Sequence, residues 1–236
     1  MSLFTQQEAD CPACGKPVSF ALVASVNADR RPDLRAAILD GSFQCEACPA
    51  CGKVFRLEPE FTYLDVARGQ WLLLQPVERL ADWPQLEEQA GSSYALAYGE
   101  RAAPPAREIG KGLKARVTFG WEALREKLVA AEHGLDDVVL EMLKLRLLRS
   151  LPDQPLADGN ELRLQAVEGD VLQLAWLAVP SGRPVEVLAV PRELYDGIAK
   201  DAAWKPLREQ VGGGFFVDLH RVLVPAGAED PVEADA

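Results

Sequence analysis

The 236-residue chain is poor in histidine, in positive charge and in long apolar runs, and each shortage excludes a class of protein. With two histidines the chain offers few ligands for a catalytic zinc site, which needs an open coordination position and a nearby acid or base. The 25 basic residues are outnumbered by 36 acidic ones, and the resulting net charge of −11 disfavours nucleic-acid binding. No run of about 18 apolar residues is present to span a bilayer.

Residues 1–10 also lack the apolar stretch of a secretory signal, so we expect a cytoplasmic protein. Free thiols stay reduced in that compartment. The five cysteines of the chain therefore favour metal or redox chemistry over a structural disulfide framework.

The segment CPACGK occurs twice, at 11–16 and 48–53, and each copy carries a C-x-x-C pair followed by glycine. A zinc ribbon holds its ion between two such turns, where four sulfurs converge tetrahedrally. Glycine tolerates the positive φ that turns the following N–H groups toward the sulfurs. We therefore expect one structural Zn²⁺ per chain. The expected ligands are Cys11, Cys14, Cys48 and Cys51.

Cys45 offers a second way to pair Cys48. In that pairing the residue after the second cysteine is Pro49, whose nitrogen has no hydrogen to donate to a sulfur. We therefore pair Cys48 with Cys51 and expect Cys45 to be a small buried apolar residue beside the site. The alternatives are an exchange ligand at Cys45 and a thioredoxin-like redox pair, although the duplication and the glycines argue against redox chemistry.

No known catalytic motif occurs, so we expect a protein that is not an enzyme. Both histidines have structural explanations, because His133 precedes a helix-ending glycine and His220 alternates with apolar neighbours. The acids of EHGLDD offer a magnesium site, but a helix cap and a solvated turn explain them more simply. These acids are Glu132, Asp136 and Asp137.

The pattern of apolar residues predicts an α+β protein whose first part, residues 1–78, is a zinc-ribbon-like antiparallel module. A helix is predicted within 31–41, with Pro32 near its start and Gly41 at its end. KVFRLEPEFTY is predicted to be partly strand and QWLLLQP to be a short buried strand. We expect the sheet beside the metal site to be antiparallel.

The second part, residues 79–151, is predicted to be a linker followed by a helical hairpin. The prolines and glycines of 78–112 indicate a linker or exposed loop around one weak helix at PQLEEQA. LKARVTFG then predicts a strand, and a helix is expected to end at Gly134.

The helix predicted over 135–151 has an unusual surface. Its polar face is narrow, and its apolar circumference is wider than one core-facing side requires. Two explanations stay open, namely a central helix covered by its own chain and a helix that also forms a homodimer. The narrow polar face consists of Asp137, Glu141 and Lys144.

The third part, residues 152–226, is predicted to be an α+β region rich in β-hairpins. ELRLQAV and VLQLAWLAV form a hairpin with Gly169 in its turn, and PVEVLAV adds a strand. Pro191 opens a helix, and a last strand or helix follows the glycines of VGGGFF. The acidic tail, residues 227–236, is expected to be disordered.

With these residues in view, the chain resembles the CpXC family of bacterial and archaeal proteins, named for two Cys-Pro-x-Cys motifs. The resemblance lies in the two CPACGK segments, in LDGSFQCEACPACGK and in EALREKLVAAEHGLDDVVLEMLKL, and it covers most of residues 10–150. It implies ligand roles for the same four cysteines and leaves Cys45 as an additional thiol. It implies a metal site and not a reaction.

Three functions compete on this sequence. The first is a non-enzymatic zinc protein that presents sheet or helix surface to a protein partner, with a homodimer as one form. The second is a nucleic-acid-associated zinc-ribbon factor, and the third is an enzyme whose site is built from residues distant in sequence. The acidity and the missing catalytic motifs favour the first. The second rests on Arg30, Arg31 and Arg35 and on Lys111, Lys114 and Arg116.

Overall fold

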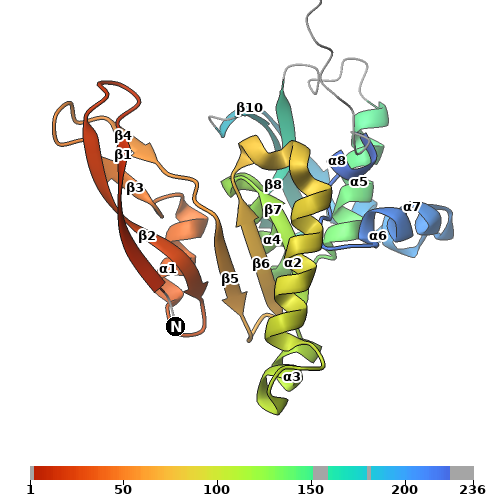
Figure 1. The fold of residues 1–236 in the computed structure, drawn as a ribbon. Coiled ribbons are helices and arrows are strands. Elements are labelled where there is room, and N and C mark those ends of the chain that lie inside the picture. Colours follow the sequence, from red (N-terminus) through yellow and green to blue (C-terminus); the bar gives the residue numbers. More distant parts are fainter. Residues whose placement is uncertain (1–2, 151–158, 180–181, 224–236) are drawn as a thin grey trace, which may run out of the picture.

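The computed structural model describes residues 3–150, 159–179 and 182–223 and confirms the α+β class. The described residues form a five-stranded, a three-stranded and a two-stranded sheet, with helices between and around them (Figure 1). The two larger sheets lie on opposite sides of a helical layer.

The five-stranded sheet has the order β1-β2-β5-β6-β7. Its strands are β1 (Leu3–Asp10), β2 (Pro17–Asn27), β5 (Phe61–Asp65), β6 (Gln70–Gln75) and β7 (Lys114–Phe119). β1–β2 and β5–β6 pair antiparallel, whereas β2–β5 and β6–β7 pair parallel. The prediction of an antiparallel sheet was therefore wrong for the sheet as a whole. Its two parallel pairs follow long connections, which parallel pairing requires.

The hairpins near the N-terminus are antiparallel as predicted. β3 (Cys45–Ala47) and β4 (Val54–Arg56) form the two-stranded sheet, and β1 and β2 form a longer hairpin that the sequence analysis did not anticipate. The tips of these two hairpins lie at the same end of the molecule (Figure 1). The helix between them, α1 (Pro32–Asp40), ends at Gly41 with φ of 81°, as predicted.

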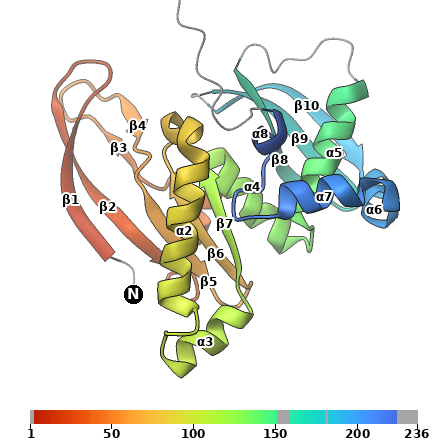
Figure 2. The ribbon, with the colours of Figure 1, turned by 45° about the vertical axis from the view of Figure 1, so that its right-hand side comes forward.

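Helices cover both faces of the five-stranded sheet. On one face, α2 (Trp83–Tyr98) packs Leu86 and Ala90 against β6 and β7 (Figure 2). On the other face lie α1 and α4 (Trp121–Glu132), which bury Ile38, Leu124 and Leu128 against β2, β5 and β6. β7 joins this sheet beside β6, so the sheet crosses the predicted boundary between residues 1–78 and 79–151.

The helix predicted at PQLEEQA is confirmed, because these residues lie within α2, but the prediction of a linker or exposed loop for the rest of 78–112 was wrong. The segment holds the 3₁₀ helix η1 (Val77–Asp82), the long helix α2 and the short helix α3 (Pro104–Lys111). α2 and α3 each carry proline in the first turn. Proline is tolerated there because the first N–H groups of a helix have no intrahelical partner. The prolines therefore mark helix starts and not helix breaks.

The C-terminal part has a three-stranded antiparallel sheet of order β10-β9-β8. The predicted hairpin is confirmed, with Gly169 at φ of 58° between β8 and β9. The later glycines precede a short helix, and a further helix, α7, was not anticipated. The elements are β8 (Asn160–Glu168), β9 (Val171–Ala178), β10 (Arg183–Pro191), α6 (Arg192–Lys200), η3 (Ala202–Trp204), α7 (Lys205–Gly212) and α8 (His220–Leu223). The predicted disordered tail lies outside the described residues.

The helix predicted over 135–151 is present as α5 (Asp137–Ser150), but its polar face is turned inward. Lys144 is 1% exposed and Glu141 is fully buried. The sequence pattern grouped these side chains on one polar face but did not show whether that face meets solvent or the core. In the structure they meet charges from α4 and β7, which no local pattern reveals.

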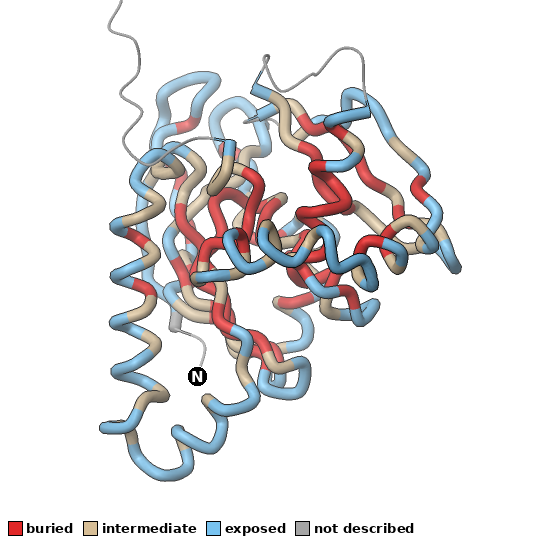
Figure 3. The backbone as a smooth tube through the Cα atoms, turned by 90° about the vertical axis from the view of Figure 1, so that its right-hand side faces the viewer, coloured by how far each residue is buried: buried red, intermediate tan, exposed pale blue. Residues whose placement is uncertain are grey.

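The apolar side of α5 is also covered within the chain. Val139, Leu143 and Leu145 are buried in a core shared with the three-stranded sheet and α6. A homodimer through Val138, Val139, Leu143 and Leu147 stays a prediction, but all four side chains pack within the core of the chain itself. Figure 3 shows the same distribution, with buried backbone concentrated in the central elements and mostly exposed or half-buried backbone in α2. None of the helices in the described ranges is long and apolar enough to cross a membrane.

A buried ionic cluster ties α4 to α5 and β8. The Glu126 carboxylate of α4 lies 2.6 Å from the Lys144 ammonium and 3.3 Å from Arg163 of β8. Lys144 also contacts Glu141 at 2.8 Å, and Arg163 contacts Asp218 at 2.6 Å. Burial lowers the pKa of Lys144, but Glu126 and Glu141 outweigh it and hold that pKa above its usual value. The ammonium therefore stays charged inside the protein.

Replacing Lys144 with methionine should lower the free energy of unfolding by about 3–5 kcal/mol, because it leaves buried carboxylates without their cation. Urea unfolding followed by tryptophan fluorescence measures the change. Lys205→Met is the matched control, since the Lys205 side chain is 71% exposed and its ammonium lies 3.9 Å from Glu209. Equal stability of the two variants would show that the Lys144 contacts contribute nothing.

Candidate metal centre

The first CPACGK segment forms a tight turn at the tip of the β1–β2 hairpin. The N–H of Cys11 donates to the Lys16 carbonyl at 2.9 Å, and the N–H of Gly15 donates to the Cys11 carbonyl at 2.8 Å. Gly15 has φ of 66°, a value that favours glycine. The glycine therefore closes the turn that carries Cys11 and Cys14.

The second CPACGK segment, at the tip of the β3–β4 hairpin, repeats this turn. Cys48 N–H donates to the Lys53 carbonyl at 2.9 Å, and Gly52 N–H donates to the Cys48 carbonyl at 2.8 Å, with Gly52 at φ of 71°. The two segments therefore adopt the same backbone conformation, as their common sequence predicts.

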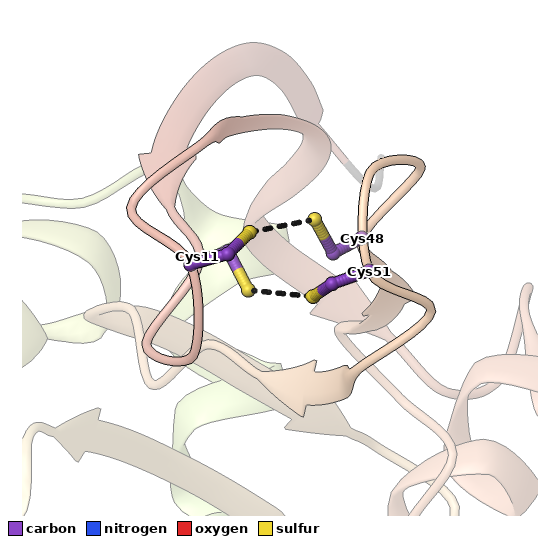
Figure 4. A group of neighbouring side chains, drawn as sticks. Cys11, Cys48 and Cys51 are labelled. Atoms are coloured by element: carbon purple, nitrogen blue, oxygen red, sulfur yellow. Dashed lines mark hydrogen bonds between the residues drawn. The ribbon is translucent and has the colours of Figure 1, made fainter.

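The four cysteine sulfurs of the two turns converge on one point (Figure 4). Their Sγ atoms all lie within 4.8 Å of one another, and the pairs Cys11–Cys51 and Cys14–Cys48 are 3.6 Å apart. A tetrahedral ion with sulfur ligands at about 2.3 Å sets its sulfurs roughly 3.8 Å apart. The spacing is far from the roughly 2 Å of a disulfide and fits a four-sulfur metal site.

The thiols of the cluster differ in acidity. Burial raises the pKa of Cys48, but the backbone N–H groups of Ala50 and Cys51 outweigh it and lower that pKa to about 7. For Cys14 the Lys16 N–H lowers the pKa, while the neighbouring thiols and burial raise it to about 12. Each thiol that loses its proton thus makes deprotonation of the remaining thiols less favourable. A bound cation relieves this repulsion by compensating the thiolates.

Cys45 does not belong to the cluster. It lies on β3, and its Sγ donates to the Gly41 carbonyl at 3.3 Å. The side chain is half-buried, so the expectation of a buried residue was wrong. The choice of Cys48 and Cys51 as the pair agrees with the geometry, because these two cysteines share the turn that Gly52 closes.

A small apolar core supports the cluster from below. It consists of Val18 and Phe20 from β2 together with the buried Cys11 and Cys48, and the Phe20 and Phe55 rings meet edge to face at 5.2 Å. This core is separate from the larger cores on the two faces of the sheet. The two turns therefore have few apolar contacts of their own to hold them together.

The acids proposed as a magnesium site are otherwise engaged. Asp136 accepts the N–H groups of Val138 and Val139, so it caps α5 as the sequence analysis expected. Glu132 binds Arg35 at 3.1 Å, and Asp137 binds Arg116 at 2.6 Å. Among the described residues, the four cysteines are the one group with metal-ligand spacing.

The two histidines hold positions at helix ends. His133 is the C-cap of α4, where the sequence analysis placed it. His220 begins α8, and its Nδ1 lies 2.7 Å from Asp218. Burial lowers the pKa of His220, but the Asp218 carboxylate outweighs it and raises that pKa above its usual value. The imidazole thus extends the buried ionic cluster, a role that its apolar sequence neighbours did not reveal.

The basic runs are also largely paired with carboxylates. Arg31 binds Asp33 at 2.6 Å, and Lys111 binds Glu108 at 2.6 Å. The runs therefore do not form a free cationic stripe of the kind that duplex binding uses.

Comparison with known proteins agrees with the geometry. The family model described as CpXC protein matches residues 9–144, which is more than half of the chain and includes both turns. Neither the curated proteins nor the solved structures contain a match to the chain. The match and the four clustered cysteines in its two Cys-Pro-x-Cys motifs show that this chain belongs to the CpXC family.

Proposed function

We propose that the cysteine cluster binds one structural Zn²⁺ ion that joins the two hairpin tips. The proposal is carried by one observation, the convergence of four Sγ atoms at 3.6–4.8 Å. Thiolates are soft ligands, and a tetrahedral four-sulfur set is typical of zinc. Four protein ligands fill the coordination shell, so the ion supplies cohesion and no open position for a substrate.

Purified protein should contain one zinc ion per chain, and Cys48→Ser should lose most of it because three thiolates bind zinc more weakly than four. Elemental analysis by mass spectrometry gives the ratio. Cys45→Ser is the matched control, since Cys45 lies outside the cluster, and it should keep its zinc. A metal-free Cys45→Ser protein beside a fully loaded Cys48→Ser protein would overturn the ligand assignment.

Removal of the ion should loosen the hairpin tips and not the whole fold. The core below the cluster has only four buried residues, whereas β5 and β6 belong to larger cores shared with α2 and α4. Ligand binding and local folding are therefore coupled at the tips. The expected region is therefore residues 5–22 and 45–57, which form the two hairpin tips and the strands beside them.

Hydrogen exchange with and without a strong chelator measures this effect. Amides of 5–22 and 45–57 should exchange faster after chelation, and those of β6, β7 and α4 should keep their protection. Chelator added to the Cys48→Ser protein is the control and should change little. Uniform loss of protection along the chain would contradict a local role for the ion.

We further propose that the protein works through protein–protein contact and not through catalysis. The closed ligand set of the metal site supports this view. An exposed apolar sheet edge supports it as well, because Val185 and Val187 of β10 are 62% and 58% exposed. β10 is the outer strand of its sheet, and outer strands with exposed apolar side chains pair readily with another chain. A second copy of this protein is the partner that we propose for β10.

Sedimentation equilibrium at tens of micromolar tests this pairing. The wild-type mass should be twice that of the 25.8 kDa chain, and Val187→Lys should restore the single-chain mass by placing a charge in the contact. Val54→Lys is the control, because Val54 is 58% exposed on β4. A wild-type mass near 25.8 kDa rules out the dimer.

A further inference from the structure

A cationic cleft lies away from the metal centre, where the β5–β6 turn, the start of β7 and the α4–α5 turn come together. Its volume is about 320 Å³, which is the size of a site for a small ligand. The charged residues that line it are Arg68, Lys114, Arg116, Lys127 and Asp137. Four cations therefore face one carboxylate, in a protein whose net charge is −11.

The four cations differ in how they are held. Lys127 is buried and Arg116 is half-buried, and they bind Asp137 at 3.3 and 2.6 Å, so both are fixed in place. The side chains of Lys114 and Arg68 are 48% and 42% exposed. The cleft thus has a fixed positive lining and two partly exposed cations, each of which also contacts a carboxylate.

Asp137 is the carboxylate that organises this lining. Burial raises its pKa, but Lys127, Arg116 and Lys114 outweigh burial and hold that pKa far below its usual value. Asp137 is therefore an anion at neutral pH and offsets only one of the four lining cations. Two further carboxylates, Asp65 and Asp136, contact Arg68 and Lys114 at 3.2 and 3.1 Å without lining the cleft themselves.

Glycines line the cleft and keep its backbone close together. Gly69 has φ of 63°, and a Cβ atom there would lie 2.6 Å from the Gly112 carbonyl oxygen. Gly134, on the α4–α5 turn, also has φ of 63°. A side chain at Gly69 would clash with this carbonyl, and the positive φ of Gly69 and Gly134 favours glycine at both turns.

A buried amide at the cleft lacks one partner. The Gln70 Nε2 donates to the Lys127 carbonyl at 3.0 Å, while its Oε1 accepts no hydrogen bond from any described residue. Gln70 is 5% exposed and lines the cleft. Buried polar atoms almost always have a partner, so this acceptor indicates a ligand that carries a donor.

We propose that this cleft binds a phosphate group, either as free inorganic phosphate or at the end of a small phosphate monoester. Lys114 and Arg68 bind its ionised oxygens through charge-assisted hydrogen bonds. Because the second pKa of such a group is about 6, part of the population carries a P–OH that can donate to Gln70. A carboxylate is fully ionised at neutral pH and has no such donor, and the phosphodiesters of nucleic acids also lack it.

Calorimetric titration of the zinc-loaded full-length protein tests the proposal, with inorganic phosphate, glycerol 3-phosphate and acetate as separate probes. Phosphate or its monoester should bind, with affinity that falls as salt is raised, and acetate should bind at least about tenfold more weakly. Binding of the monoester alone identifies the source of the phosphate group. Absence of heat with both phosphates, or tighter binding of acetate, overturns the proposal.

Substitution of the exposed cations locates the site. Lys114→Ala and Arg68→Ala should each weaken phosphate binding by about 10- to 100-fold, the value expected for a charged hydrogen bond. Lys111→Ala is the matched control, because Lys111 is 71% exposed, lies on α3 near the cleft and does not line it. Circular dichroism shows that each variant is folded. If phosphate binding were weakened equally in all three variants, the cause would be general attraction to surface charge, and the proposed site would be wrong.

Discussion

The buried Glu126 carboxylate is the interaction on which the arrangement of the two sheets depends. Its Oε1 binds Lys144 of α5 at 2.6 Å, and its Oε2 accepts the Leu164 N–H of β8 at 2.6 Å. One side chain of α4 thus joins the helix that covers the five-stranded sheet to a second helix and to the second sheet. Burying these charges is costly unless every partner is in place, so the cluster specifies one packing of these elements more than it adds stability.

The same helix sets the positions of the cysteine cluster and the cationic cleft. Near its start, Trp121 packs against Phe43 and Phe61, close to the strand that leads to the second cysteine turn. At its other end, Lys127 and Gly134 line the cationic cleft. The metal centre and the cleft share no residue. Loss of metal and loss of anion binding should consequently be separable by mutation.

Local sequence patterns predicted those parts of the fold whose conformation is set by interactions within one short segment. The duplicated CPACGK segments adopt the same turn because the glycine at positive φ and both backbone hydrogen bonds of each turn lie within the six residues of the segment. Gly41 and Gly134 end helices for the same local reason. Prolines were harder to interpret, since Pro104 and Pro105 suggested a loop but stand in the first turn of α3. Proline excludes only the interior of a helix, and sequence alone did not decide between these positions.

The sequence by itself determined which four cysteines lie in the two C-x-x-C turns, how they pair within those turns, and most of the helices and strands. Only the tertiary structure decided which charges are buried and what they contact. Glu126 and Lys144 are 18 residues apart, and Glu126 and Arg163 are 37 apart, so no local periodicity links them. The cationic cleft is also assembled from three segments that are far apart in the sequence, namely residues 68–72, 112–116 and 127–137. Charge pairing at such separations depends on how the two sheets pack. A sequence does not distinguish a charged residue that faces water from one that faces a buried partner.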